Sequence, residues 1–241
     1  MKSFIYILLI TFAITTTATA QTKTVVSKSD TIRVDVWADV LCPFCYLGKR
    51  HFEKALSAFD HKSNVLVVWH SYQLNPEAQK EYKGDIYDLM AEKFGKTRQW
   101  SMDHTKYMQK EAAEAGLTYN YDIMKPTNTF DAHRLIQLAA THGLQDKAEE
   151  ALFHAYFTEG KNISDAATLI QIGTTLGLSE AEVKAMLQSN AYADKVHADE
   201  KAAEDLRVPG VPYFVINGRY KIDGAQPPQT FLKTLEKAWA K

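Results

Sequence analysis

Cysteine is nearly absent from this chain, since its 241 residues contain only Cys42 and Cys45. One pair so closely spaced excludes a framework of disulfide bonds, because a bridge between these positions would close a very short loop and hardly constrain the unfolded chain. A structural zinc site needs four ligands, and the sequence has neither a second CxxC motif nor a closely spaced histidine pair. The two cysteines therefore indicate redox chemistry, and we expect no metal and no cofactor.

The chain also lacks an excess of charge. Lys and Arg number 28 against 29 Asp and Glu, and no polybasic run occurs, which argues against nucleic-acid binding. With 46% hydrophobic and 24% charged residues, the composition is that of a globular protein long enough to bury a full core.

Long apolar runs are missing, apart from one near the N-terminus. The run over residues 4–14 is too short to span a bilayer comfortably, and it lies between Lys2 and an A-x-A pattern at 18–20, as in a secretory signal. We predict that residues 1–20 are a signal peptide and that the protein is exported, with the periplasm as the expected compartment. After cleavage no stable membrane insertion is expected. An uncleaved anchor is the alternative.

The two cysteines lie where a predicted strand meets a predicted helix. Residues 31–37 alternate β-branched or aromatic side chains with polar ones, and residues 46–59 place apolar side chains at helical spacing. Pro43 suits the first turn of that helix, because its missing N–H would have no partner there. Cys42 would then lie over free N–H groups, which stabilise a thiolate. We predict that Cys42 is the nucleophile and that Cys45 resolves the mixed disulfide.

The rest of the chain divides into two patterns. A β-branched run at 64–70 completes a β-α-β unit, and strand signals return only at 208–222, followed by an amphipathic helix. The segment between these runs has helical periodicity and is almost free of strand signals. We therefore predict an α/β fold, β-α-β followed by β-β-α, with a large all-helical insertion. The expected domains are 31–83 together with 207–241, and the helical insertion 84–206.

A Cys-Pro-Phe-Cys motif follows the first predicted strand, and Gly-Val-Pro at 210–212 begins the segment of strand signals at 208–222. The order of these motifs resembles the DsbA-like branch of the thioredoxin superfamily. Within this branch, segments 39–48 and 128–135 resemble the FrnE-type thiol-disulfide oxidoreductases. The likeness covers essentially all of 31–240, and it implies a thioredoxin fold with a redox-active dithiol.

The resemblance also implies a substrate-binding surface. Pro212 matches the cis-proline that lies against the active-site disulfide in this superfamily. A cis bond there would leave the backbone of Val211 free to pair with an extended substrate segment beside Cys42. We predict that Val211 and Pro212, together with Pro43 and Phe44 between the cysteines, bind substrate. Phe44 replaces a histidine of the best-known oxidant of the family and cannot donate a hydrogen bond to a thiolate, so a weaker oxidant is expected.

Several other residues have an ordinary interpretation. Asp39 could accept a proton from Cys45, although satisfying loop N–H groups is the interpretation we favour. His133 lies on a largely apolar helix face, which is more typical of a core residue than of a catalytic one. The remaining candidates are aromatic residues that either line a groove or simply pack: Tyr82, Tyr87, Tyr119 and Tyr121.

The predicted function is an exported enzyme that exchanges disulfides with cysteines of other exported proteins. Its partners would be those proteins and a redox partner that the sequence does not identify, and no oligomeric state is predicted. Oxidase, reductase and isomerase share the same residues, so the direction stays open. One alternative is a glutathione-dependent isomerase or transferase on small aromatic molecules, as some relatives in the superfamily are. Another is a peptide-binding chaperone that keeps the motif as a relic.

Overall fold

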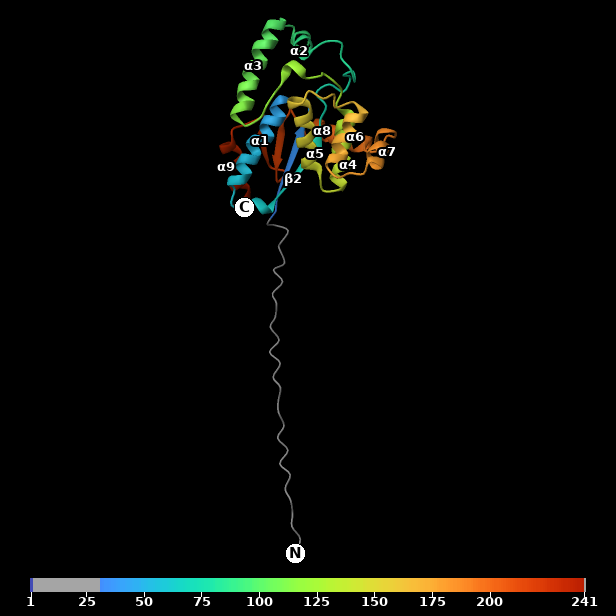
Figure 1. Ribbon diagram of the computed structural model, residues 1–241. Coiled ribbons are helices and arrows are strands. Elements are labelled where there is room, and N and C mark those ends of the chain that lie inside the picture. The colour runs from blue at the N-terminus through green and yellow to red at the C-terminus, as the bar shows by residue number, and fades with distance from the viewer. Residues whose placement is uncertain (2–30, 241) are drawn as a thin grey trace. The chain divides into compact units, whose positions relative to one another are not determined.

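The computed structural model describes Met1 and residues 31–240 (Figure 1). Apart from Met1, the predicted signal peptide lies outside the described residues. Among the residues described, no helix has both the length and the apolar character that crossing a membrane requires.

The sheet has four strands in the order β2-β1-β3-β4. They are β1 (Ile32–Ala38), β2 (Val65–Ser71), β3 (Tyr213–Ile216) and β4 (Tyr220–Asp223). β2 runs parallel to β1, whereas β3 is antiparallel to β1 and β4 is antiparallel to β3. The register places Tyr213 opposite Trp37, so the start of β3 meets the end of β1. The loop that follows β1 and the loop that precedes β3 therefore lie together at the same end of the two central strands.

Two helices that are far apart in the sequence cover one face of the sheet. These are α1 (Pro43–Ala58) and α9 (Pro228–Trp239), which lie side by side (Figure 1). Phe214 of β3 points into this layer, with its ring centroid 5.7 Å from that of Phe52 and 4.7 Å from that of Phe231. Such tilted and edge-on aromatic contacts add to the apolar burial that holds the two helices on the sheet.

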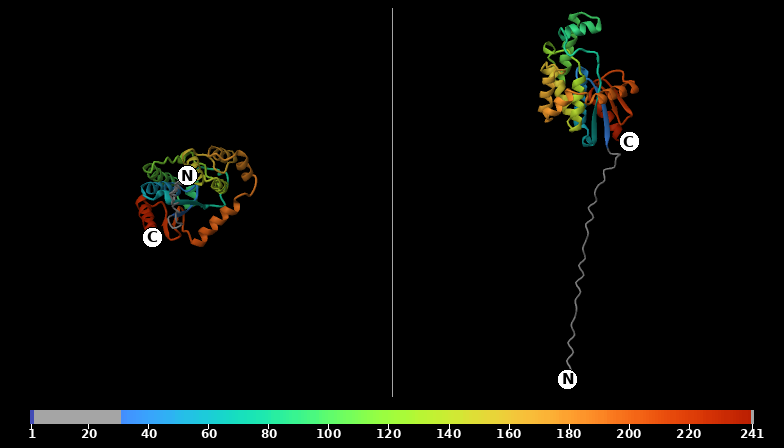
Figure 2. Two further views of the ribbon diagram at one scale, coloured as in Figure 1. Left: turned by 90° about the horizontal axis from the view of Figure 1, so that it is seen from below. Right: turned by 90° about the vertical axis from the view of Figure 1, so that its right-hand side faces the viewer.

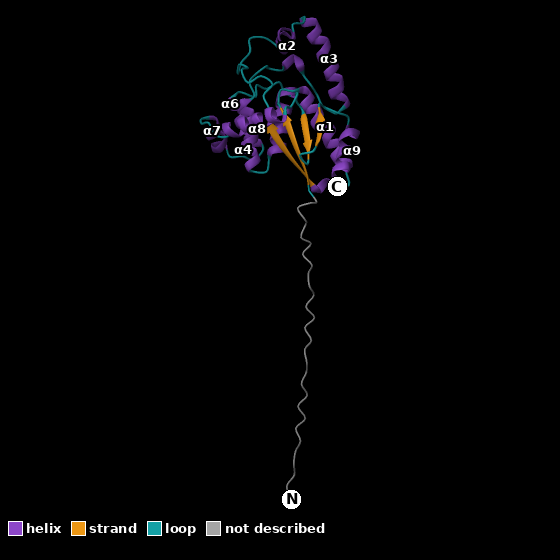
Figure 3. Ribbon diagram, turned by 180° about the vertical axis from the view of Figure 1, so that it is seen from behind, coloured by secondary structure: helices purple, strands orange, loops and turns teal. Residues whose placement is uncertain are grey.

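On the opposite face of the sheet, α8 (Ala193–Leu206) packs against β2, and the view from behind shows it beside the strands (Figure 3). Because successive side chains of a strand alternate between faces, Tyr213 and Val215 point away from α1. They form a small buried cluster with Trp37 of β1 and Ala203 of α8. α8 leads directly into the loop before β3, so its packing also fixes where that loop begins.

The connection between β2 and β3 consists of helices joined by loops. It contains α2 (Ile86–Phe94), α3 (Arg98–Glu114), α4 (Phe130–Thr141), α5 (Gln145–Phe153), α6 (Ala166–Thr175), α7 (Glu180–Leu187) and α8, with a short helical turn at Tyr121–Ile123 after α3. Another short helical turn, Lys62–Asn64, precedes β2. A π-helical turn, His154–Thr158, continues α5. α2 and α3 pack on each other beyond one end of the sheet (Figures 1 and 2). This arrangement confirms the predicted fold class, and the division into two domains stays a prediction.

The helical insertion is fixed to α1 by aromatic and charged side chains. The ring of Tyr46 stacks on Phe153 at the end of α5, with centroids 4.8 Å apart. Lys49 is buried, and its ammonium lies 3.2 Å from carboxylate oxygens of both Asp146 and Glu150 of α5. A buried ammonium needs such partners, because an unpaired charge in the interior is costly. The helix that begins at the cysteines is therefore held from both sides, by the sheet and by the insertion.

Candidate active site

Cys42 is the residue immediately before the first turn of α1. Its backbone is extended (φ −85°, ψ 114°), Pro43 follows in the first turn, and the Cys42 carbonyl accepts the N–H groups of Cys45 at 3.0 Å and Tyr46 at 3.3 Å. The sequence places the motif at this strand-to-helix junction, and the structure agrees. At such a position the free N–H groups and the helix dipole favour a negative charge.

The two thiols differ in their surroundings. Cys42 has 4% of its surface exposed, whereas Cys45 has none. Burial raises the pKa of the Cys45 thiol well above its usual value, and the neighbouring Cys42 thiol and the Asp39 carboxylate raise it further, while a backbone hydrogen bond from Asp39 acts in the opposite direction. Cys45 is therefore held as a protonated thiol. This difference supports the predicted order, in which Cys42 reacts first and Cys45 second.

The loop before β3 brings Val211 and Pro212 to Cys42. The Val211–Pro212 peptide bond is cis, as the resemblance implied. The Cys42 sulfur lies 3.5 Å from the Val211 carbonyl oxygen, to which its thiol donates a weak hydrogen bond. The Pro212 carbonyl accepts the N–H of Gly224 at 2.9 Å, which attaches this turn to the end of β4. Pro212 is buried and Val211 is half-buried, so Val211 is the more accessible of the two.

Gly48 is a site residue that sequence reasoning missed. A Cβ atom at this position would lie 2.9 Å from Cγ of Pro212, closer than packed atoms tolerate. α1 can therefore approach the proline turn only because residue 48 has no side chain. A glycine within a helical pattern costs stability relative to alanine, and that cost is the signal that could have suggested a close approach.

Phe44 points outward from the first turn of α1. It is 41% exposed, in contrast to the buried cysteines on either side. Pro43 is half-buried. Leu74, whose loop is hydrogen-bonded to Asp39 just before the motif, is also 41% exposed. Exposed apolar side chains at and near the motif are available to contact another molecule.

Comparison with known proteins identifies the family. The model of the DsbA-like thioredoxin domain matches residues 33–236. This chain belongs to the DsbA-like thioredoxin domain family. The prediction of a DsbA-like disulfide oxidoreductase is confirmed at the level of this family, whereas the FrnE-type subgroup stays a prediction.

Two curated relatives have similar sequences. The uncharacterized protein YwbO of Bacillus subtilis is 28% identical over 207 residues, which cover 85% of this chain and 96% of YwbO. The thiol:disulfide interchange protein DsbL of Lelliottia amnigena is 28% identical over 182 residues, covering 75% of this chain and 66% of DsbL. Both alignments extend well beyond the cysteine motif, so the similarity includes the helical insertion.

Solved structures show the same fold. A Streptomyces coelicolor protein described as a probable DsbA oxidoreductase is 35% identical with a TM-score of 0.83, covering 87% of this chain and 91% of that protein. The cytosolic disulfide reductase DsbM of Pseudomonas aeruginosa, solved with glutathione, is 17% identical with a TM-score of 0.63, covering 87% of this chain and all of DsbM. At that lower identity the likeness shows the fold alone.

Of the aromatic residues noted in the sequence, Tyr119 lies closest to the motif of this DsbA-like protein. Its hydroxyl donates a 2.6 Å hydrogen bond to the Pro43 carbonyl, and its ring stacks on Phe157 at 4.6 Å. Tyr119 is buried, so it holds the first turn of α1 rather than lining an open groove. Two other tyrosines bond elsewhere: the hydroxyl of Tyr87 donates to Asp122 and that of Tyr82 to Glu92.

Asp39 is fully buried below the cysteine loop. Its carboxylate accepts the N–H of Leu74 at 2.7 Å and that of Leu41 at 3.4 Å, which is the loop-stabilising role that we favoured from the sequence. The carboxylate also faces His133 of α4, whose Nε2 lies 3.4 Å from the Asp39 Oδ1. The structure therefore brings together two residues that the sequence offered separately.

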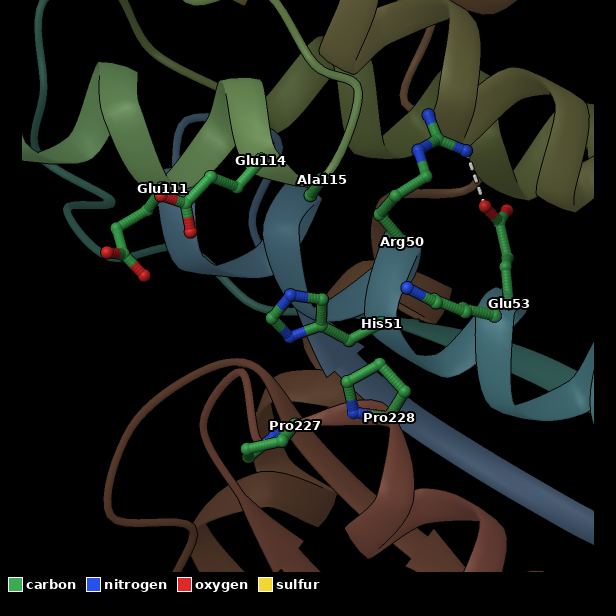
Figure 4. Close-up of a pocket in the computed structure, with 9 residues that line it drawn as sticks. Arg50, His51, Glu53, Glu111, Glu114, Ala115, Pro227 and Pro228 are labelled. Atoms are coloured by element: carbon green, nitrogen blue, oxygen red, sulfur yellow. Dashed lines mark hydrogen bonds and ion pairs between the residues drawn. The ribbon is translucent and has the colours of Figure 1, made fainter.

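A pocket of about 570 Å³ lies between α1, α3 and the start of α9 (Figure 4). Arg50 and His51 of α1 line it together with Glu111 and Glu114 of α3, so its lining carries charges of both signs. None of the predicted site residues lines this pocket. Among the described residues, no three histidine, cysteine, aspartate or glutamate side chains are placed to hold a metal ion. The cysteine motif therefore lies outside this pocket.

Proposed function

We propose that this protein is an exported thiol-disulfide oxidoreductase that exchanges disulfides with cysteines of other exported proteins. The observation that carries the proposal is the position of the Cys42 sulfur, before the first turn of α1 and 3.5 Å from the Val211 carbonyl oxygen. The helix N-terminus favours the thiolate, and the backbone at Val211 can pair with an extended segment that carries the substrate's cysteine.

In the reducing direction the reaction takes two steps. The Cys42 thiolate attacks one sulfur of a substrate disulfide, so that bond breaks, a Cys42–substrate mixed disulfide forms, and one substrate thiolate leaves. Cys45 then loses its proton and attacks the Cys42 sulfur, which releases the second substrate thiolate and forms the Cys42–Cys45 disulfide. Each departing thiolate takes a proton at neutral pH. The same steps in reverse oxidise two substrate thiols.

The surroundings of Cys42 favour extended polypeptide as substrate. Phe44 and Leu74 offer exposed apolar side chains, and Val211 is half-buried next to the sulfur. An unfolded or partly folded chain can present both a cysteine and adjacent apolar side chains to this surface, whereas a folded domain seldom exposes both.

A glutathione-dependent isomerase or transferase is the second candidate, favoured by the shared fold with DsbM solved with glutathione. The two candidates make opposite demands on Cys45. Dithiol exchange needs it to resolve the mixed disulfide, whereas glutathione chemistry at one sulfur does not. The presence of both cysteines, one of them buried against the other, supports dithiol exchange.

The test mixes the reduced wild type, Cys42→Ser and Cys45→Ser proteins with an unfolded protein that contains a disulfide bond. We expect Cys42→Ser to lose exchange altogether and Cys45→Ser to accumulate a mixed disulfide through Cys42, detected by non-reducing electrophoresis and mass spectrometry. Undiminished turnover in Cys45→Ser would favour the glutathione enzyme. Full function in Cys42→Ser would favour the chaperone. The equilibrium with a glutathione buffer then gives the direction of the exchange.

Export is tested separately on the full chain. The Lys2 charge, the apolar run at 4–14 and the A-x-A pattern at 18–20 support cleavage before Gln21. We expect the mature protein in the periplasmic fraction with Gln21 at its N-terminus, determined by mass spectrometry. An intact N-terminus in the cytosolic fraction would contradict export while leaving the disulfide chemistry untouched.

A further inference from the structure

An oppositely charged pair is buried directly behind the resolving cysteine. Asp39 has no exposed surface and His133 has 1%, and the His133 Nε2 lies 3.4 Å from the Asp39 Oδ1. The Nε2 atom has no hydrogen-bond partner of good geometry, so the contact is chiefly one of charge. A buried carboxylate without a nearby cation would be costly, and His133 is the cationic group closest to it in this part of the fold.

The charges around His133 favour its protonated form. Burial lowers the pKa of the imidazole. The Asp39 carboxylate and, more weakly, Glu149 of α5 and Glu200 of α8 raise this pKa by more than burial lowers it, so the net shift is upward. Glu149 is itself buried, which raises its pKa to about 7 despite the charges of His133 and Lys49. When His133 is protonated, the helical insertion places a positive charge next to Asp39.

The Asp39 carboxylate of this pair also acts on the Cys45 thiol. The Asp39 charge opposes ionisation of the Cys45 thiol, as do burial and the Cys42 thiol, and Cys45 in turn lies near the Tyr119 hydroxyl. If Asp39 were uncompensated, the Cys45 thiolate would have to form beside a bare carboxylate in a site closed to water. Like charges interact strongly under those conditions.

We propose that His133 is a positioning residue for the resolving step, whose imidazolium neutralises Asp39 so that Cys45 can ionise and attack the mixed disulfide. This inference rests on the proposed function. In that step the S–S bond between Cys42 and the substrate breaks and the Cys42–Cys45 bond forms. The proton lost by Cys45 is balanced by the proton that the released substrate thiolate takes up, and no further oxidant or reductant is needed.

The experiment compares four proteins: wild type, His133→Gln, Asp39→Asn and the double variant. Each reduced protein is mixed with a chromogenic aromatic disulfide, which releases one coloured thiolate when Cys42 is modified and a second when Cys45 resolves the mixed disulfide. The rate of the second release is measured against pH. His142→Gln is the matched control, because His142 is a more exposed histidine that pairs with Glu182 away from the cysteines.

We expect His133→Gln to slow the second release about tenfold at neutral pH and to raise its pH midpoint, the equivalent of one pKa unit. Asp39→Asn should lower the midpoint, because the asparagine removes the charge while its one amide oxygen can still accept the shorter of the two loop hydrogen bonds, from the Leu74 N–H. The double variant should return to within about threefold of wild type, since no uncompensated carboxylate remains. His142→Gln should match wild type, and the first release should stay unchanged in all four proteins.

A double variant as slow as His133→Gln would overturn the inference, because a loss of packing would not be repaired by removing the Asp39 charge. An unchanged rate in a folded His133→Gln would overturn it as well. If His133→Gln fails to fold, Asp39→Asn alone decides, and an unshifted midpoint overturns the inference. Absence of a second release in the wild type would instead contradict the proposed dithiol function.

Discussion

The sulfur of Cys42 lies 3.5 Å from the carbonyl oxygen of Val211, a residue 169 positions later in the chain. The strand register produces this contact. With Tyr213 opposite Trp37, the residues before β3 must meet the residues after β1. The helical insertion, which includes α8, separates these residues in the sequence, but it does not lie between them in the fold. The contact between Cys42 and Val211 therefore forms despite the large insertion.

The first prediction concerns the order in which the two cysteines react. A small alkylating reagent added to the reduced protein should label Cys42 at least about tenfold faster than Cys45, because the thiolate is the reactive form and burial raises the pKa of Cys45. Mass spectrometry of peptides after short labelling times measures the two rates. In denaturant the rates should become similar, and faster labelling of Cys45 in the folded protein would reverse the assigned roles.

The arrangement of the fold could be predicted from the sequence because its signals are local. Strand alternation at 31–37, helical spacing after Cys45 and the absence of strand signals through the insertion each reflect which face of an element is buried. The position of α8 on the sheet could not be predicted in the same way, because the pattern of a charged amphipathic helix does not indicate which surface the helix packs on.

The site could be predicted only in part. Cys42, Cys45 and Pro212 stand out by residue type and spacing, whereas Gly48 matters because of a single close approach to a residue far away in the sequence. His133 likewise gains its importance from Asp39, and the pairing depends on how α4 packs behind the cysteine loop. Contacts of this kind are decided by tertiary packing, which no pattern within one segment encodes.

The second prediction tests the close packing at Gly48. Gly48→Ala should destabilise the protein by about 1–3 kcal/mol, because the added methyl group would overlap the Pro212 ring and the cost of overpacking exceeds the gain in helix propensity. Urea unfolding measures the change, and the rate of mixed-disulfide formation should fall with it. Gly210→Ala is the control, since no atom would lie within 4 Å of its added Cβ. A stabilised Gly48→Ala would show that α1 is not tightly packed there.

The third prediction concerns the hydroxyl of Tyr119. Tyr119→Phe should cost about 1 kcal/mol of stability, because it removes a buried hydrogen bond to the Pro43 carbonyl while keeping the ring stacking. The exchange rate at Cys42 should fall as well, since the first turn of α1 loses an anchor. Tyr107→Phe, at a position 54% exposed, provides the control and should change stability by less than about 0.5 kcal/mol. Equal effects of the two substitutions would contradict a positioning role for Tyr119.

The last prediction rests on His70 of β2, which joins the sheet to α8. Its Nε2 lies 2.8 Å from the Asp35 carboxylate and its Nδ1 lies 2.7 Å from that of Asp199, while its ring stacks on Trp37 at 4.4 Å. Burial lowers the pKa of His70, but the two carboxylates outweigh it and raise the value from 6.5 to about 9. Protonated His70 therefore stabilises the folded state.

The sign of the pH dependence follows from that upward shift. The contribution of His70 should be fully present below about pH 6.5 and should be lost as the pH rises through about 9, with a total of about 1–3 kcal/mol. Urea unfolding measures the free energy of unfolding of wild type and of His70→Gln between about pH 6.5 and about pH 9. The difference between the two proteins gives the contribution of His70, because the titration of the other groups cancels. The variant should be less stable at low pH and should approach wild type as the pH rises. His154→Gln, a half-exposed histidine paired with Glu159, should give a curve parallel to wild type. Parallel curves for His70→Gln would show instead that His70 holds α8 by packing and not by charge.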